Sequence, residues 1–445
     1  MHMLAVDFIL DTRFDDLPSA TIHEAIRCLV DTLGVAVGGS QTQLASIIHN
    51  HAARQFCGTD AILWQDGRKA SAAGAALANG MTIDALDAHD GMKLTKGHVG
   101  CGVFPSLIAV MQAEGIDDPK EFLTSIVIGY EIGTRAGIAL HASACDFHTS
   151  GAWISLAAAA LTARQLKLTK GQTREALGIA EYHGPRSQMM RVIDAPTMLK
   201  DGSGWGAMAG VSAAYLAQDG FTGAPAITME DPELAKYWDD LGQNWYIEQQ
   251  YIKLYPVCRW AQPAAEGALA LIREHDVAAD QITSVKVETF HEAKRLASIP
   301  TTTEQAQYSL PFSVAAAVVR GTIGVAEVTS DGLNDQQIIG LAKTVEIVED
   351  DAFNDAFPAR RFARTHFYLN DGRILSSAAT EAQGDPENKV SDQVIWDKFR
   401  GLTTPVLGTA WSEQFLTLAQ GIADAPSIKP LFELMAQAAQ TKELK

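Results

Sequence analysis

Titratable side chains are unusually dense between Asn79 and Pro105, in a segment rich in glycine and flanked by apolar, helix-like runs. Beside a hydrophobic core such groups are costly unless they are paired or solvated. Their usual roles in such a place are proton transfer, charge binding or metal ligation. A polar surface loop between two helices would have a similar composition, so composition alone leaves both interpretations open. The titratable residues of this segment are Asp84, Asp87, His89, Asp90, Lys93, Lys96 and His98.

Three basic residues further along the chain stand among apolar neighbours. Lys200 lies between Met198–Leu199 and a glycine-rich run, and Lys253 lies in the apolar stretch IKLYP. A lysine in such company either extends its amine to water or binds an anion. Arg191 follows two methionines, and it either binds a carboxylate through two parallel hydrogen bonds or lies on the surface.

Six stretches between Asn79 and Gly321 resemble, in order, the pattern of the MmgE/PrpD family. This family includes 2-methylcitrate dehydratases, cis-aconitate decarboxylases and iminodisuccinate epimerase. One short motif would be weak evidence, whereas six in the same order make the resemblance specific. The stretches are NGMTIDALDAHDGMKLTKGHVGCGVFP, GYEIGTRAGIAL, DFHTSGAW with His148, TMLKDGSGWGAMAG (followed by GFTGAP) with Lys200, IKLYPVCRWAQPA with Lys253, and AQYSLPFSVAAAVVRG.

The resemblance implies acid–base chemistry on a small anionic carboxylate. Abstracting a proton next to a carboxylate builds negative charge beside existing charge, so the site needs a base, cations and a proton donor. At the positions that match the family, His98 and His148 are candidates for acid and base, and Asp87 for orienting or assisting them. Lys200 and Lys253 are candidates for binding substrate carboxylates. The alternatives without a role in catalysis are that Asp87 is a surface carboxylate and that the two histidines only form hydrogen bonds to the backbone.

Three positions depart from the cis-aconitate decarboxylase branch of the family. Gly91 stands where a threonine is expected, Cys258 where a histidine is expected, and Phe312 where a tyrosine is expected. We expect all three to line the substrate pocket. Their loss of polar groups argues against decarboxylation of cis-aconitate. Because dehydratases dominate the resemblance, the resemblance implies a dehydratase similar to 2-methylcitrate dehydratase, with epimerisation of an amino- or imino-dicarboxylate as the alternative.

Two rival interpretations remain. A divalent metal could be held by the acidic and histidine side chains of this region, as in a metal-dependent hydrolase. Lys93 and Lys96 would repel such a cation, and no helical His-x-x-x-His pair fixes a geometry, so we expect no metal. Alternatively, an inactive paralogue keeps the fold. No glycine-rich phosphate-binding loop is present, and we expect no cofactor. The proposed metal ligands would be Asp87, His89, Asp90, His98 and His148.

Composition narrows the class of protein further. The 445 residues are 47% hydrophobic and 20% charged, which is typical of a soluble globular protein. The formal charge of −18 and the lack of a basic stripe exclude a nucleic-acid binder. No stretch is long and apolar enough to span a bilayer, and the acidic N-terminus does not resemble a signal peptide. Five scattered cysteines without a Cys-x-x-Cys pair favour free thiols in the cytoplasm.

The elements that must position these residues are mostly helices. Ile22, Ile26, Leu29 and Leu33 recur at helical spacing, with Ser19 as an N-cap and Gly38–Gly39 as a stop. Alanine-rich runs let helices approach closely. Further helices are predicted at 71–84, 105–113, 119–140, 151–166, 174–182, 205–219 and 261–275.

The pattern changes near residue 280. Strands are predicted at 282–290 and from Lys343, and Asn370-Asp371-Gly372 indicates a hairpin. Helices are predicted at 309–320 and 335–342, and helical pattern returns after Asp392. The expected fold is therefore mainly α. It has a large helical domain of residues 1–275 and 389–445, and an inserted α+β domain, 276–388, that forms a lid. The resemblance implies the same layout and a homodimer.

Overall fold

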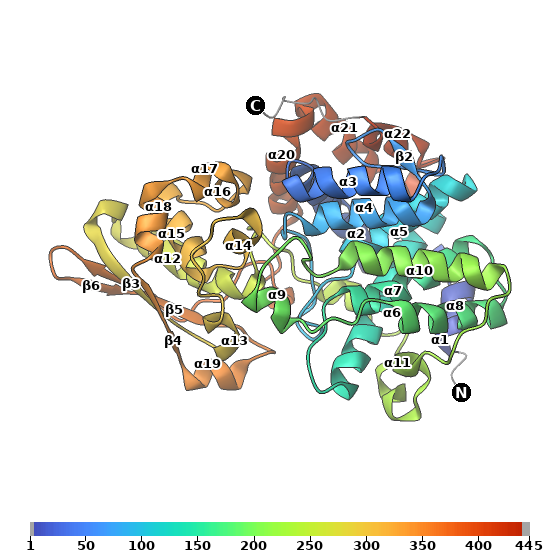
Figure 1. Ribbon diagram of the computed structural model, residues 1–445, viewed down its shortest axis with the longest axis horizontal. Coiled ribbons are helices and arrows are strands. Elements are labelled where there is room, and N and C mark those ends of the chain that lie inside the picture. Colours follow the sequence, from blue (N-terminus) through green and yellow to red (C-terminus); the bar gives the residue numbers. More distant parts are fainter. Residues whose placement is uncertain (1–3, 438–445) are drawn as a thin grey trace.

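Two bodies of different composition lie side by side in the computed structural model, which describes residues 4–437 (Figure 1). The larger body is built of helices from both ends of the chain, and the smaller one contains a four-stranded sheet. Each has its own core. The core of the larger body takes residues up to Ile252 and from Ile395 onward, and that of the smaller takes Val257 to Leu369 together with Met189–Ile193. The predicted mainly α fold with a smaller α+β part is confirmed.

The larger body is a bundle in which α10 lies against α7, α4 and α8, while α6 packs on α7 and α2 on α20. Among the helices of residues 4–437, none combines the length and apolarity needed to cross a membrane. The helices of the larger body are α1 (Leu4–Asp11), α2 (Ser19–Gly39), α3 (Gln43–Gln55), α4 (Ala72–Asp84), α5 (Gly100–Glu114), α6 (Pro119–Ser143), α7 (Gly151–Gln165), α8 (Lys170–His183), α10 (Ser203–Gln218), α11 (Ile227–Glu230), α20 (Asp392–Leu407), α21 (Thr409–Gln420) and α22 (Lys429–Met435), with a short hairpin of β1 (Ala61–Ile62) and β2 (Lys69–Ala70).

Helices α4 and α10 pack closely together, which places the loop after α4 beside the loop before α10. Ser71 caps α4, because its side chain accepts a hydrogen bond from the Gly74 amide. A Cβ added at Gly204 would lie 2.2 Å from the Leu77 carbonyl oxygen, so only glycine allows this approach. The C-terminal end of α4 therefore lies beside the N-terminal end of α10. The amide of Ser203 donates to Asp84 across this junction, at 3.3 Å.

The C-terminal segment completes the larger body through an ion pair. Lys398 of α20 donates to the carboxylate of Asp31 on α2 at 2.6 Å, and to the carbonyl of Ala88 at the same distance. Both side chains are largely buried, so the pair is held within the bundle. The contact with Ala88 ties the helix to the loop that follows α4.

The smaller body is a sheet of order β4-β3-β5-β6, made of β3 (Ile282–Thr289), β4 (Val345–Glu349), β5 (Ala363–Leu369) and β6 (Ile374–Ser376). β3 pairs in parallel with β4 and antiparallel with β5, so Val285 lies between Val345 and Phe367. The predicted hairpin joins β5 and β6 at a turn where Gly372 has φ +87°. Its helices are α12 (Gln262–His275), α13 (His291–Lys294), α14 (Thr303–Gln307), α15 (Leu310–Arg320), α16 (Val325–Val328), α17 (Ser330–Leu333), α18 (Gln336–Ala342) and α19 (Asp351–Ala356).

Helix α12 shares the core of this sheet, although the sequence analysis assigned it to the helical domain. The Thr365 hydroxyl of β5 donates to the Ala264 carbonyl at 2.9 Å, and α12 packs on α15. The apolar core of the smaller body thus begins at Val257. A short helix, α9 (Met190–Asp194), lies between the two bodies and contributes Val192 and Ile193 to the second core (Figure 1).

Several helix starts differ from prediction; α8, for example, begins at Lys170 and not at the predicted Arg174. Helix α5 begins at Gly100, well before the Pro105 that was taken as its first turn, because Gly100 to Phe104 are buried and continue the helix. Ser19 is the first residue of α2, and Pro18 occupies its N-cap position without a side-chain cap. Helix α3, capped by Thr42, was not predicted.

Candidate active site

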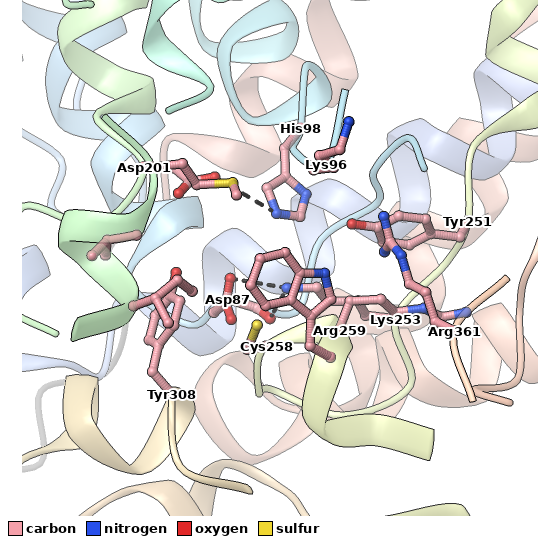
Figure 2. Close-up of a pocket in the computed structure, with 14 residues that line it drawn as sticks. Asp87, Lys96, His98, Asp201, Tyr251, Lys253, Cys258, Arg259, Tyr308 and Arg361 are labelled. Carbon is pink, nitrogen blue, oxygen red and sulfur yellow. Dashed lines mark hydrogen bonds and ion pairs between the residues drawn. The ribbon is translucent and has the colours of Figure 1, made fainter. Parts of the chain in front are cut away.

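A small pocket lies where the two bodies meet (Figure 2). Four of its lining side chains are basic, which contrasts with the acidic protein as a whole. The larger body contributes Asp87, Lys96, His98, Asp201, Tyr251 and Lys253. The smaller body and the α9 region contribute Met189, Val192, Ile193, Cys258, Arg259, Trp260, Tyr308 and Arg361.

Asp87 and Lys253 form a buried ion pair in this pocket. The Lys253 amine donates to the Asp87 carboxylate at 2.9 Å and to the Asp87 carbonyl at 3.0 Å. Burial raises the pKa of Asp87, but the charge of Lys253, followed by other cations nearby, outweighs burial and leaves that pKa below its ordinary value. Burial lowers the pKa of Lys253, and Asp87 more than restores it. The pair is therefore ionised, and the lysine is fixed to the loop after α4.

The ring of His98 is held in one orientation. Its Nδ1 is bonded to the carbonyl of Asp90. Because a carbonyl can only accept, Nδ1 carries the hydrogen and Nε2 has a free lone pair. Nε2 lies 3.9 Å from a carboxylate oxygen of Asp201. Burial and then Lys253 lower the pKa of His98 to about 4, so the imidazole is neutral at pH 7 and able to accept a proton.

Three further side chains fix the backbone at His98. The His98 amide donates to the Ser150 hydroxyl at 3.0 Å, and that hydroxyl donates to Asp201 at 2.7 Å. The Trp153 indole donates to the His98 carbonyl at 2.9 Å. Asp201 follows Lys200 directly, and the sequence analysis missed it. Its position in the DGSG turn before α10 was the available signal.

Lys200 lies in the wall beside this pocket. Its amine donates to the Gln307 side chain at 2.5 Å and lies 4.6 Å from the centre of the Tyr308 ring. It also lines an adjoining cavity, together with Arg191. Lys200 therefore has no carboxylate partner within hydrogen-bond distance among the described residues, and its charge is available to an anion at the border of the two cavities.

Unusual backbone conformations gather at this site. Six described non-glycine residues have φ in the left-handed region, and Asp87, Lys96 and Lys200 are three of them, with φ of 55°, 54° and 49°. This region disfavours side chains with a Cβ. Such strain persists only where the surrounding structure imposes it, and it often marks a functional site.

Five residues proposed from the sequence are not among those that line the pocket: His148, Phe312, Arg191, Lys200 and Gly91. His148 lies behind it, with its ring stacked on His141 at a centroid distance of 6.5 Å and its Nδ1 3.8 Å from Asp146. Phe312 is fully buried in the core of the smaller body. Arg191 is exposed and lines the adjoining cavity. Tyr308, which lies between α14 and α15, lines the pocket instead of Phe312 of α15.

The other two departures from the family pattern have a structural explanation. Cys258 lines the pocket, where burial raises the pKa of its thiol to about 12 and keeps it uncharged. Gly91 pairs with Tyr251 through two backbone hydrogen bonds of 3.0 and 2.7 Å. A Cβ at Gly91 would lie 2.4 Å from the Tyr251 hydroxyl and 2.7 Å from His98 Nδ1. No threonine fits there while Tyr251 keeps this position.

Several lining residues were not proposed from the sequence. Arg259 is fully engaged, since it bonds to Asp385 and donates at 2.8 Å to both Gln262 and the Gln383 carbonyl. Tyr308 and Trp260 stand inside stretches that carry the family resemblance, which was an available signal. Lys96 stands in the titratable segment but was not assigned to the site, and nothing in the local sequence distinguished Arg361 from a surface residue. The residues missed are Lys96, Asp201, Tyr251, Arg259, Trp260, Tyr308 and Arg361.

A set of metal-ligand types also occurs here. Asp87, His89 and His98 offer donor atoms within 4.8 Å of one another. Within residues 4–437, neither ring nitrogen of the buried His89 has a hydrogen-bond partner. Burial lowers the pKa of His89 well below its ordinary value, so the ring is neutral and could ligate. The ammonium of Lys253 on Asp87 opposes a second cation at the same carboxylate.

Comparison with known proteins agrees with this geometry. The MmgE/PrpD N-terminal domain matches residues 4–236, and the MmgE/PrpD C-terminal domain matches residues 255–423. The chain therefore belongs to the MmgE/PrpD family. The second match begins close to Val257, where the core of the smaller body begins.

Two characterised relatives are similar to almost the whole chain. The cis-aconitate decarboxylase-like protein oryM of Aspergillus oryzae is 21% identical, with 97% of this chain and 95% of that protein covered. The cis-aconitate decarboxylase of Mus musculus is 23% identical, with 95% of this chain and 91% of that protein covered. The resemblance found in the sequence is thus confirmed at the level of the family.

Proposed function

We propose that the protein is a lyase that needs no cofactor and acts on a di- or tricarboxylate by abstracting a proton next to a carboxylate. Membership of the MmgE/PrpD family and relatives named for a decarboxylase support an enzyme of the lyase type. The observation that carries the proposal is a neutral His98 with a free Nε2, in a pocket that also holds the Asp87–Lys253 pair.

His98 Nε2 is the proposed base. Its other nitrogen is fixed by the Asp90 carbonyl, so the lone pair of Nε2 has a constant direction. The neighbouring carboxylate of Asp201 stabilises the imidazolium that forms when the proton is taken. A positioned base of this kind contributes roughly 10²–10⁴-fold in rate.

Cations stabilise the negative charge that develops on the substrate. Lys253 is buried and held by Asp87, so little reorganisation is needed when an enediolate forms beside it. Lys200 adds a second charge at the border of the pocket. We assign both lysines to the binding of substrate carboxylates. Asp87 acts by positioning Lys253.

Dehydration is the preferred outcome of the abstraction, as in a 2-methylcitrate dehydratase. The proton donor to the departing hydroxyl must be protonated at neutral pH and must reach the pocket. The tyrosine hydroxyls of Tyr251 and Tyr308 meet the first condition, because burial raises the pKa of each. Epimerisation of an amino- or imino-dicarboxylate is the alternative, since it needs the same abstraction and a return of the proton to the opposite face.

The decisive experiment is incubation with candidate di- and tricarboxylates in deuterated water, followed by NMR. An alkene product indicates dehydration, and exchange with inversion indicates epimerisation. Exchange should persist after exhaustive chelation. Wild-type protein that exchanges no C–H proton of any such substrate would contradict the proposal and favour an inactive paralogue.

A metal-dependent hydrolase is the second candidate, favoured by the clustered donor atoms of Asp87, His89 and His98. It predicts stoichiometric metal in the purified protein by elemental analysis. It also predicts that activity is lost on chelation and restored by one divalent metal. The cofactor-free proposal predicts neither result.

We further propose a cytoplasmic homodimer in which the smaller body acts as a lid. The smaller body supplies one wall of the pocket, so a change in the angle between the bodies would open or close it. Light scattering at micromolar concentration should give the mass of a dimer. Small-angle scattering with and without bound carboxylate should show a change in the angle between the bodies, and no change would contradict the lid.

A further inference from the structure

The pocket has a second basic end, and part of its hydrogen-bond donor capacity has no partner among residues 4–437. Figure 2 shows Tyr251 and Arg361 together on one side of the pocket, and Asp87, Asp201 and Tyr308 on the other. Arg361 is 3% exposed and precedes β5. Its Nη2 donates to the Lys93 carbonyl at 3.2 Å, but its Nε is enclosed and has no hydrogen-bond partner among residues 4–437.

A buried guanidinium with an unused donor is unusual, because an unpaired charged donor is costly to bury. The same arginine lies over the face of Tyr251, with its Cζ 5.7 Å from the ring centre. That ring is also packed on Arg259 at 4.7 Å, so its position is fixed from both sides. The Tyr251 hydroxyl donates to no described residue, and it lies at the pocket because Gly91 leaves space for it.

Lys96 completes this end. Its amine lies 4.1 Å from the centre of the Phe147 ring and donates to the Leu94 carbonyl at 3.2 Å, and no acidic side chain forms an ion pair with it among the described residues. Asp385 and Glu387 are paired with Lys93 of the same loop, at 3.0 and 2.8 Å. Arg361 and Lys96 therefore present positive charge to the pocket without a protein counter-ion.

We propose that Arg361, Lys96 and Tyr251 form a second carboxylate-binding subsite, opposite the Asp87–Lys253 pair. Guanidinium, ammonium and phenol donors together match the oxygens of a carboxylate, and a guanidinium can bind both oxygens at once. The reacting carbon then lies between the two ends, below His98. A substrate that spans the pocket must carry at least two carboxylates. This assignment rests on the proposed function and specifies its substrate class.

The test compares carboxylates of one and more charges on the whole protein. Isothermal titration calorimetry with succinate, glutarate and tricarballylate, against propionate, measures the gain from a second carboxylate. Wild-type protein should bind the best polycarboxylate at least about tenfold more tightly than propionate. Arg361→Leu should weaken the polycarboxylate by about thirtyfold or more and leave propionate nearly unchanged. Lys253→Met should weaken both classes.

Matched variants separate the subsite from a folding defect. Arg360→Leu makes the same change at the neighbouring residue, which is exposed and paired with Glu381, and should bind all ligands as wild type does. Tyr251→Phe removes only one hydroxyl and should give a smaller loss confined to polycarboxylates. Circular dichroism checks that each variant is folded.

The outcomes distinguish this inference from the function on which it rests. If Arg361→Leu and Tyr251→Phe both keep the wild-type preference for polycarboxylates, the subsite is wrong even where deuterium exchange occurs. If the preference depends on Arg361 but no C–H exchange is found with any polycarboxylate, the subsite stands and the lyase proposal fails. Wild-type protein that binds none of these carboxylates overturns the subsite as well.

Discussion

The two walls of the pocket use their charges differently. Around His98, Asp87 pairs with Lys253 and the His98 ring is fixed by the Asp90 carbonyl, so the groups proposed for the chemistry have defined partners. On the wall that contains Arg361, an enclosed donor has no partner among the described residues. Paired groups keep one geometry, which proton transfer needs, whereas donors without a protein partner are available to bind a ligand. The comparison suggests that chemistry belongs to the first wall and substrate choice to the second.

The largest expected effect is that of substituting His98, because the comparison of the two walls assigns it the role of the base. His98→Gln should lower the rate of substrate C–H exchange by roughly 10²–10⁴-fold. His148→Gln should have a much smaller effect, since that ring stacks on His141 outside the pocket. Single-turnover deuterium exchange measures both. Equal losses in the two variants would return His148 to the reaction, and wild-type exchange in His98→Gln would remove His98 from it.

The Asp87–Lys253 pair should contribute to the free energy of unfolding as well as to kcat/KM. Lys253→Met leaves a buried carboxylate without its partner, and breaking such a pair costs roughly 3–5 kcal/mol. Combining it with Asp87→Asn removes the unpaired charge. Urea unfolding should therefore find the double variant more stable than Lys253→Met alone, while kcat/KM stays low in both. If the double variant is no more stable than Lys253→Met, the unpaired charge of Asp87 is not the cause of the lost stability.

The sequence predicts the first wall much better than the second, for a physical reason. Asp87, His98 and Lys253 stand in short motifs whose neighbours fix their backbone, so local pattern identifies them. Arg361 reaches the pocket only because the small sheet places the start of β5 against the loop after α4. That contact joins residues 268 positions apart, and no local pattern encodes it.

The same distinction holds for the fold. Helices with regular apolar spacing and clear caps, such as α4 with Ser71, are found within a residue or two. The four-stranded sheet is also found, because its strands alternate and its hairpin carries Asp371-Gly372. The domain to which α12 belongs is not predicted correctly. The pattern of an amphipathic helix shows which face is buried but not which element covers that face. His148 fails similarly, because a motif match does not give the direction of a side chain.

Gly91 allows a direct test of how Tyr251 is held at the pocket. Gly91→Ala would place a Cβ within 2.4 Å of the Tyr251 hydroxyl. Overpacking of this kind costs roughly 1–3 kcal/mol, and it should also displace Tyr251 and weaken polycarboxylate binding. Adding Tyr251→Phe removes the hydroxyl that the new Cβ meets first and should restore part of the stability but not the binding, as measured by thermal unfolding and calorimetry. Gly91→Ala with wild-type stability and binding would show that Tyr251 is free to move.

The smallest expected effect is on the pH profile, where each wall controls one limb. Burial and Lys253 lower the pKa of His98 to about 4, so the base is protonated below that pH, and kcat/KM should rise as pH increases through it. Burial and Arg361 lower the pKa of Lys96 to about 8, with Glu292 opposing. Lys96 therefore loses its charge as pH rises through 8, and kcat/KM should fall there. A rate profile from pH 5 to 10 measures the alkaline limb.

The substitution Lys96→Arg keeps the charge and should move the alkaline limb upward. Lys96→Met should remove that limb and lower kcat/KM by about tenfold, the value of one exposed charge-assisted contact of roughly 1.4 kcal/mol. Lys167 is a matched control, because it is exposed and has the same left-handed backbone, with φ of 53°. Lys167→Met should change neither limb. An alkaline limb that survives in Lys96→Met belongs to another group, and Lys96 would then not hold a carboxylate.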